Sequence, residues 1–268
     1  MGNLHEGHLS LVRIARGRGG LTVASIFVNP LQFAPQEDYS NYPRSLERDC
    51  EQLASVGCDI VFAPSVGDMY PRAQAYTVHP APALADILEG SSRPGFFTGV
   101  CTVVLKIFNV VQPRAAVFGK KDYQQLLIIT DMVRQFALPV DVIPADTIRD
   151  ANGLALSSRN GYLEGRQAIE AAQLYAVLRK TADAVRAGRS DLRNLEEAAR
   201  ASLAARGWRP DYVAIRRQSD LGEPALGTPA AVDPSQIEPL TVMGAATLGG
   251  TRLIDNVDVH RWDGTPAV

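Results

Sequence analysis

The sequence predicts an α/β protein with a parallel sheet that is covered by helices on both faces, followed by a smaller α+β domain. Runs rich in β-branched and aromatic residues alternate with amphipathic helical runs in the first part of the chain, a pattern typical of parallel sheets. After Leu163 the pattern changes to two long helical runs and then to strand-like runs. We therefore expect one domain over 1–163 and a second over 164–268.

Each element of the first domain follows from its local pattern. The run 21–28 is β-rich and ends at Asn29-Pro30, which predicts a buried strand. The segment 45–56 has apolar residues at helical spacing, stops at Gly57, and leads into a strand at 59–63. The same criteria predict, in order, a helix at 97–111, a strand at 114–118, a helix at 122–136 and a strand at 139–143.

The second domain begins with an Ala-rich amphipathic helix over 164–187 that Gly188 ends, and a further helix over 192–206 that Gly207 ends. Strand-like runs follow at 212–215, 240–243 and 252–254. The segment 222–239 between them is rich in Pro, Gly and Ala, so we expect an exposed loop.

Composition excludes several classes of protein. The 268 residues carry 27 Lys and Arg against 29 Asp and Glu, a formal charge of -2, which provides no basic field for nucleic acid. Three cysteines without a C-x-x-C pair favour a reducing compartment over a zinc or disulfide framework. Apolar runs are too short for a membrane helix, and the start of the chain lacks the apolar core of a signal peptide. We expect a cytoplasmic protein that binds neither nucleic acid nor membrane.

The first segment whose residues suit catalysis or ligand binding is Met1-Gly-Asn-Leu-His-Glu-Gly-His8, which leads into a helical apolar pattern. A tight turn that opens a helix offers unpaired N–H groups and a positive dipole end to an anion. His5 and His8, three residues apart, lie on one face and add donors that strengthen as negative charge builds. This predicts a phosphate site; the alternative is a polar N-terminus with unused histidines.

Three more segments follow predicted strands. Gly119-Lys-Lys-Asp122 can reach phosphate and ribose, or be a solvated loop with a helix cap. The serines and arginine of 149–160 can clamp phosphate, or surround a plain Asn-Gly turn. Asn29 and Gln32 stand past the carboxyl end of the first strand, where open sheets bind ligands, or they satisfy loop backbone.

Taken together, these segments resemble the pantoate–β-alanine ligases, nucleotidyltransferases with an HxGH signature. The resemblance rests on the HxGH turn, Ser-Ile-Phe-Val-Asn-Pro-Leu-Gln-Phe, Gly-Lys-Lys-Asp-Tyr-Gln-Gln-Leu and Leu-Ser-Ser-Arg-Asn. It covers 1–163 and resumes at 247–256. It implies a Rossmann-like first domain, a C-terminal lid domain and a homodimer. It also implies the synthesis of pantothenate from (R)-pantoate, β-alanine and ATP with Mg²⁺, through pantoyl-adenylate, with AMP and pyrophosphate released, in the route to coenzyme A.

The resemblance also implies roles for individual residues. His8, His5 and Lys121 are expected to be catalytic. Pantoate is expected to bind Gln32, Gln125 and Asn29, with Gln32 also at the β-alanine site. The residues expected to bind ATP are Met1, Gly2, Asn3, Leu4, His5, Glu6, Gly7, His8, Gly119, Lys120, Lys121, Asp122, Ile148, Leu156, Ser157, Ser158 and Arg159.

The metal position of the family follows Tyr42-Pro-Arg44 and falls at Asp49 and Gln52, which helical spacing places on one face. The alternatives are a solvated helix, and magnesium held mainly by ATP oxygens and water.

The chain departs from the family at two places. Phe96 stands where many members have His, so a polar contact is expected to be lost. Members also carry a strand ending in Pro-Thr just before the HxGH turn, whereas this sequence starts at Met1. The loss of the polar contact predicts a lowered activity. The first strand of the sheet is also expected to be absent, and three alternatives stay open: a misfolded chain, a weakly active one, or a start codon assigned too late.

Two other functions compete with the ligase. Another nucleotidyltransferase with the same phosphate machinery would not require Gln32 and Gln125. A non-catalytic nucleotide-binding protein would accord with Phe96 and the absent strand. The phosphate segments together with both glutamines favour the ligase.

Overall fold

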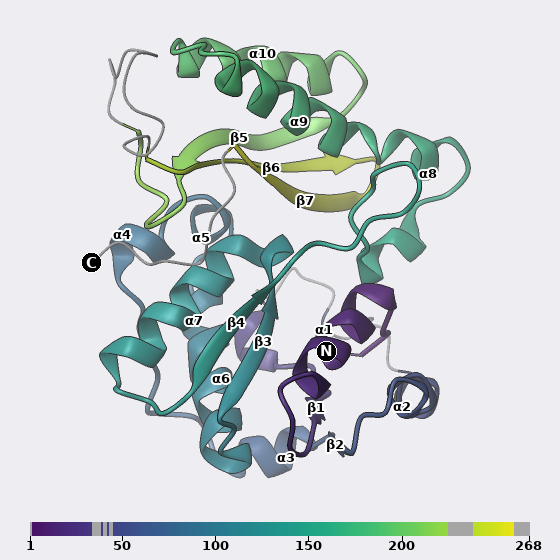
Figure 1. Cartoon of the computed structure of the whole chain (residues 1–268), viewed down its shortest axis with the longest axis vertical. Helices are drawn as coiled ribbons and strands as arrows, with labels where there is room; N and C mark the ends of the chain where they lie inside the picture. The colour runs from purple at the N-terminus through teal and green to yellow at the C-terminus, as the bar shows by residue number, and fades with distance from the viewer. Residues whose placement is uncertain (1, 34–38, 40–41, 43–44, 225–237, 260–268) are drawn as a thin grey trace. The chain divides into compact units, whose positions relative to one another are not determined.

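The computed structural model describes residues 2–33, 39, 42, 45–224 and 238–259. The chain divides into two compact units, Met1–Ile148 and Arg149–Val268 (Figure 1). The sequence analysis placed its domain boundary after Leu163, whereas this division falls after Ile148. The segment 149–163 belongs to the second unit because Arg149 is bound to Asp255 on a strand of that unit. The boundary after Leu163 between an ATP- and pantoate-binding domain and a lid domain stays a prediction.

In unit 1, helices alternate with short strands along the chain. The elements are α1 (Glu6–Arg16), β1 (Val23–Ser25), η1 (Pro30–Gln32), α2 (Leu46–Ser55), β2 (Ile60–Phe62), α3 (Val66–Met69), α4 (Pro82–Ala85), α5 (Glu89–Ser92), α6 (Phe96–Val111), β3 (Ala115–Gly119), η2 (Lys120–Asp122), α7 (Tyr123–Gln135) and β4 (Asp141–Ala145). All the predicted helices and strands of this part are present. The short elements η1, α3, α4, α5 and η2 were not predicted.

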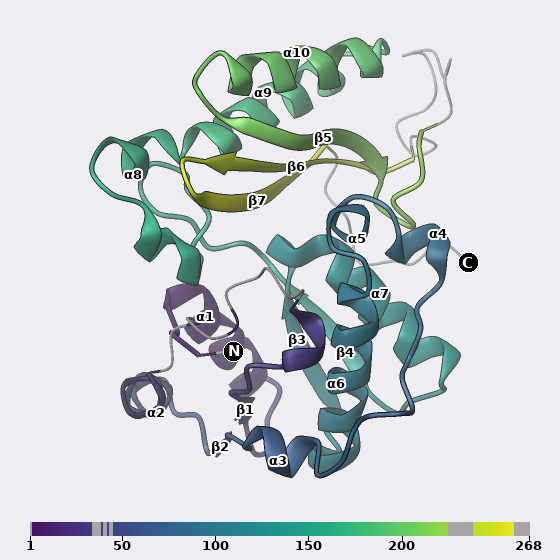
Figure 2. The same ribbon diagram turned by 180° about the vertical axis from the view of Figure 1, so that it is seen from behind.

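The parallel arrangement is confirmed, but the strands form two separate pairs. β1 pairs with β2, with Ala24 opposite Val61, and β3 pairs with β4, with Val117 opposite Ile143. The predicted strand at 21–28 is wider than β1 because only three of its residues lie in register with β2. Helices α1 and α7 pack against β3, so these helices cover strands as predicted (Figures 1 and 2).

The core of unit 1 consists of several apolar clusters. The largest lies between α6, α7 and the β3–β4 pair, and its buried members include Phe97, Cys101 and Ile129. A smaller cluster joins the start of the chain to α2 through Leu4, Leu9, Val12 and Leu53. The second cluster ties the predicted phosphate turn to α2.

Unit 2 is a three-stranded antiparallel sheet covered by helices. Its elements are η3 (Ser158–Tyr162), α8 (Arg166–Glu170), α9 (Gln173–Arg186), α10 (Leu192–Ala204), β5 (Arg209–Arg217), β6 (Leu240–Leu248) and β7 (Thr251–Asp258), with strand order β5-β6-β7. Helices α9 and α10 pack on this sheet and bury Leu178, Leu203 and Val242. The single helix predicted over 164–187 is two helices, and no sequence signal marks the break because alanine, at 171 and 172, favours helix strongly.

Most of the loop predicted over 222–239 lies outside the described residues. None of the described helices is both long enough and apolar enough to cross a membrane.

Candidate functional site

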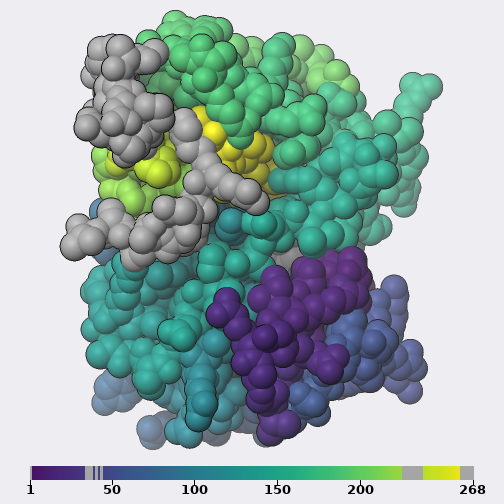
Figure 3. Space-filling view, in the orientation of Figure 1, coloured from purple at the N-terminus to yellow at the C-terminus, as the bar shows by residue number. Residues whose placement is uncertain are grey.

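The HxGH segment forms a tight turn that opens α1. Gly2 and Asn3 have φ angles of 105° and 52°, a left-handed conformation that glycine and asparagine adopt most readily. His5 is the N-cap of α1, and its Nδ1 accepts the N–H of Gly7 at 3.2 Å. The turn thus places the histidines at the positive end of the helix dipole. The N-terminal segment that includes α1, purple in Figure 3, forms part of the surface of unit 1. Met1 is outside the described residues.

His5 and His8 lie against each other, with ring centroids 4.0 Å apart. Nδ1 of His8 accepts the backbone N–H of His5 at 3.3 Å. Because Nδ1 of each ring is an acceptor, the hydrogen bonds assign the proton of each neutral ring to Nε2. Burial lowers the pKa of His5 to about 4, aided by Lys121, and lowers the pKa of His8 to about 3, aided by His5. At neutral pH both rings are therefore uncharged donors through Nε2–H.

The corner between β3 and α7 adds the positive charge. The charge of Lys121 acts on both histidines, which places these three predicted catalytic residues in one region of unit 1. Lys120 has a different partner, since its Nζ lies 2.8 Å from Oδ1 of Asp146. Asp122 is the N-cap of α7, but its side chain makes no capping hydrogen bond. The sequence allows Asp122 either to cap α7 or to contact the ribose, and the side-chain cap is absent.

Two of the three amides predicted to bind pantoate, those of Asn29 and Gln32, lie in the turn after β1. Asn29 is 1% exposed, and its Oδ1 accepts from the Tyr70 hydroxyl at 2.8 Å and from the N–H of Leu31 at 3.3 Å. Its Nδ2 donates to the carbonyl of Gly99 at 3.1 Å and to Oε1 of Gln32 at 3.3 Å. The amide of Asn29 is thus used inside the protein, and one of its bonds orients Gln32.

Helix α6 supports the same turn at close range. A Cβ on Gly99 would lie 2.2 Å from the carbonyl oxygen of Leu31, so only glycine allows this approach. Arg93 donates to the backbone carbonyl of Gln32 at 3.3 Å, and its guanidinium lies 3.6 Å from the ring centroid of Phe96. The phenylalanine that replaces the expected histidine therefore stacks on Arg93. Gln125, the other predicted pantoate residue, is half-buried on α7.

The predicted phosphate loop with Leu156, Ser157, Ser158 and Arg159 belongs to unit 2, whereas Ile148 ends unit 1. Ser157 caps η3, because its Oγ accepts the N–H of Arg159 at 3.3 Å.

The base of this loop is fixed by a buried ion pair. Arg149 donates to the two carboxylate oxygens of Asp255 at 2.6 and 2.9 Å and to the carbonyl of Gly153 at 3.1 Å. Its guanidinium also lies 3.7 Å from the ring centroid of Tyr175. The loop is thus held to β7 and α9 at its base.

Asp49, one of the two predicted metal ligands, does not fit a magnesium site. Asp49 is fully buried, and its oxygens accept the N–H groups of Asn3 at 2.9 Å and Leu4 at 2.8 Å. Mg²⁺ prefers a site where it keeps several waters, and a fully buried carboxylate leaves no room for them. Gln52 Oε1 is buried without a hydrogen-bond partner, which is a feature that suits a cation. In the part of the chain that the structure describes, no cluster of three or more His, Cys, Asp or Glu side chains suits a metal.

Sequence analysis missed the contacts that hold the site together. It named Asp49 as a metal ligand and not as an acceptor for the turn, although Asp49 precedes the buried Leu53 by four residues and so stands on the inward face of its helix. Tyr70 and Asp255 had no signal in the sequence, since their partners Asn29 and Arg149 are 41 and 106 residues away in the chain.

Comparisons with known proteins agree with one another. The profile of the family described as Pantoate-beta-alanine ligase matches residues 1–258. A pantothenate synthetase from Leptothrix cholodnii is 57% identical over 261 residues, which are 96% of this chain and 90% of that protein. The crystal structure of pantothenate synthetase from Thermus thermophilus is 42% identical, with a TM-score of 0.89 over 97% of this chain and 91% of that one. The pantoate-beta-alanine ligase from Francisella tularensis, crystallised with beta-gamma ATP and beta-alanine, is 33% identical, with a TM-score of 0.77 over 97% and 87% of the two chains.

Proposed function

The chain belongs to the pantoate–β-alanine ligase family and is a ligase, and on that premise we propose the course of its reaction. It condenses (R)-pantoate with β-alanine at the expense of ATP and supplies pantothenate to the route toward coenzyme A. In the first step a carboxylate oxygen of pantoate attacks the α-phosphorus of ATP and pyrophosphate leaves. In the second step the amine of β-alanine attacks the acyl carbon of pantoyl-adenylate and AMP leaves.

The observation that carries this proposal is the pair of neutral imidazoles at the start of α1, close to the charge of Lys121. The pantoate carboxylate, with a reference pKa of about 4, is ionised at neutral pH, so the first step requires no base and no protein nucleophile. It requires stabilisation of the negative charge that spreads over the phosphoryl oxygens. Nε2–H of His5 and His8, the helix dipole and the Lys121 ammonium all serve that purpose.

The remaining residues take roles around ATP. We assign the phosphates to the turn 2–8 and to Gly119, Ser157, Ser158 and Arg159, the ribose to Asp122, and the adenine to the backbone of Ile148 and to Leu156. We do not assign the ammonium of Lys120 to the phosphates, because it is already paired with Asp146. Lys120 belongs to the ATP site as the neighbour of Lys121.

Pantoate is assigned to Gln32 and Gln125, with Gln32 also at the β-alanine site. Asn29 acts through Gln32, since its own amide bonds are made within the protein. Mg²⁺ accompanies ATP and is held by phosphate oxygens and water. We further propose a cytoplasmic homodimer, and light scattering of the purified protein tests the dimer directly.

The decisive experiment combines product detection with isotope exchange. The protein is incubated with pantoate, β-alanine, ATP and Mg²⁺, and pantothenate and AMP are measured by mass spectrometry. Exchange of labelled pyrophosphate into ATP is expected to require pantoate but not β-alanine, because the adenylate forms first. Exchange without pantoate contradicts the proposal.

Two outcomes favour the competing functions. A preference for a phosphorylated acceptor indicates another nucleotidyltransferase. Binding of ATP without turnover in any combination indicates a nucleotide-binding protein.

A further inference from the structure

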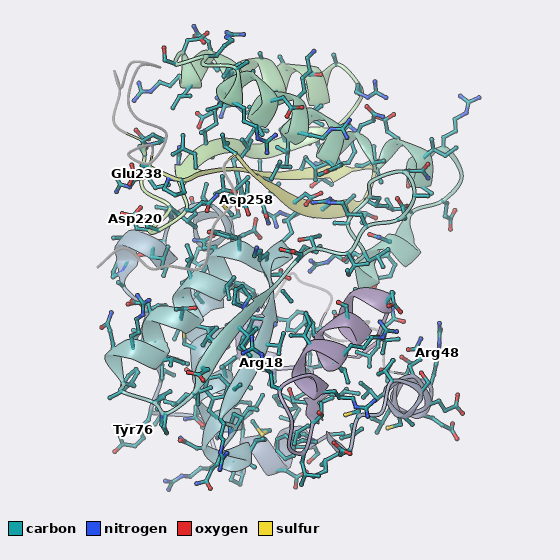
Figure 4. All side chains as sticks on the ribbon, in the orientation of Figure 1. Arg18, Arg48, Tyr76, Asp220, Glu238 and Asp258 are labelled. Carbon is teal, nitrogen blue, oxygen red and sulfur yellow. The ribbon has the colours of Figure 1, made fainter. Side chains whose placement is uncertain are left out.

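A buried carboxylate underlies the turn that carries the histidines. Asp49, on α2, is 0% exposed and accepts two backbone N–H groups, that of Asn3 through Oδ2 at 2.9 Å and that of Leu4 through Oδ1 at 2.8 Å. Its neighbour Arg48 is exposed and points away from the molecule (Figure 4). The carboxylate of Asp49 therefore binds groups inside the protein and does not face the solvent.

The shape of the turn explains why a carboxylate is needed there. Gly2 and Asn3 have positive φ angles, and the consecutive N–H groups of Asn3 and Leu4 both point to the carboxylate of Asp49. Without a partner, the buried N–H of Leu4 would be unsatisfied, at a cost of about 1 to 3 kcal/mol. Asp49 supplies both the negative charge and the acceptors.

The fixed turn continues directly into the candidate ATP site. Leu4 packs in the same apolar cluster as Leu53, which lies one helical turn after Asp49 on α2. His5 follows Leu4 directly in the chain. His5 in turn caps α1 and contacts His8. The orientation of both imidazoles thus depends on a carboxylate more than forty positions later in the chain.

We propose that Asp49 is a positioning residue for His5 and His8 and not a ligand of magnesium. The inference rests on the proposed function, because the histidines matter only if they bind ATP. The carboxylate holds the backbone of the turn, and the turn sets the direction of the two Nε2–H donors. A displacement of about 1 Å at a reacting centre is enough to cost roughly 100-fold in rate.

The test compares two matched variants. Asp49→Asn keeps the size of the side chain but replaces one acceptor oxygen by an N–H donor. Asp59→Asn makes the same change at an exposed carboxylate of unit 1, which accepts the backbone N–H of Thr22 at 2.8 Å. We expect kcat/KM for ATP to fall by about 10- to 100-fold in the first variant only. KM for β-alanine and the Mg²⁺ concentration for half-maximal activity should stay as in the wild type.

A second readout does not depend on activity. The amide protons of Asn3 and Leu4 should be protected from hydrogen exchange in the wild type and in Asp59→Asn, and exchange faster in Asp49→Asn. If Asp49→Asn fails to fold, Asp49→Glu retains the charge while shifting the carboxylate, and it should show the same selective loss for ATP.

The outcomes separate this inference from the proposed function. An inactive wild type overturns the function, while the amide exchange still decides whether Asp49 holds the turn. Wild-type kcat/KM for ATP in a folded Asp49 variant overturns the positioning role. A raised Mg²⁺ requirement that excess Mg²⁺ relieves would instead make Asp49 a metal ligand.

Discussion

His8 accepts the backbone N–H of His5 through Nδ1 at 3.3 Å, while the two rings lie 4.0 Å apart. This reciprocal capping of α1 ties the tautomers of the histidines to the start of the helix. The same hydrogen bonds that stabilise the helix end therefore leave both Nε2–H groups as donors for phosphate.

Replacing His8 by alanine removes one of these donors and should lower kcat sharply. Preorganised donors to developing oxyanions contribute about 2.7 to 4 kcal/mol, so we expect a loss of roughly 100-fold or more. Steady-state rates of pantothenate formation measure this. The exposed His79→Ala is the matched control, and equal turnover in both variants would remove the catalytic role of His8.

The two adjacent lysines should behave differently. Lys121→Ala removes the charge that acts on both histidines and is expected to lower kcat by about 100-fold. Lys120→Ala breaks a pair with the exposed Asp146, which is worth about 0 to 1 kcal/mol, and should change stability slightly and kcat much less. Measuring kcat of both variants side by side shows which lysine is catalytic. A larger loss of kcat in Lys120→Ala would assign that role to Lys120.

Stability should fall as the solution becomes more acidic than about pH 6.5, because of His5 and His8. Their folded pKa values, about 4 and about 3, lie below the ordinary value of 6.5, so the unfolded state binds more protons between these pH values. The contribution of each ring is therefore complete above its unfolded pKa and is lost as the pH falls toward its folded pKa. Thermal unfolding at pH ~7.5 and pH ~5 measures this. The wild type should lose more in Tm than a His5→Gln/His8→Gln variant, and equal losses would refute the shifts.

Gln32→Ala should chiefly raise KM for pantoate, since the side chain is assigned to substrate binding. Tyr70→Phe should act in the same direction but more weakly, because Tyr70 reaches Gln32 only through Asn29. A lost neutral hydrogen bond of about 1 kcal/mol corresponds to roughly fivefold in KM. The exposed Tyr76→Phe is the control for the tyrosine change, and a loss confined to ATP affinity would contradict both assignments.

Breaking the Arg149–Asp255 pair should destabilise unit 2. Asp255 is 4% exposed, and removal of Arg149 would leave its charge buried without an opposite charge, at a cost of about 3 to 5 kcal/mol. Urea unfolding of Arg149→Ala, Asp255→Ala and the double variant gives the coupling energy. The double variant should be less destabilised than the sum of the single ones, and additive losses would mean that the pair contributes nothing as a pair.

The sequence predicted the helices and strands well wherever a local pattern specifies them. The helix over 45–56 corresponds to α2 because its apolar spacing and Gly57 are both local signals. The extent of a strand depends on its partner, so the run 21–28 could not reveal that pairing covers Val23–Ser25 only. The short helices α4 and α5 have too few residues to show a periodic pattern.

The candidate site shows the same division. Motifs identified His5, His8 and Lys121, and the structure places them in one region. The resemblance assigned Asp49 to the metal, and the local sequence shows its helical face but not the two N–H groups that approach from residues 3 and 4. The resemblance also assigned Asn29 to pantoate, and the sequence could not show its partners Tyr70 and Gly99, which come from distant segments.

The separation of the parallel strands into two pairs affects how the spacing of the site is set. The histidines stand before β1, in the half with the β1–β2 ladder, whereas Lys121 follows directly on β3 of the other ladder. No ladder in the described part of the chain joins the two pairs, so the distance between imidazoles and ammonium depends on how α1 packs against β3. That distance is tuned by side-chain volume at a helix–strand contact. Conservative changes of size there should alter catalysis while every residue that touches substrate stays the same.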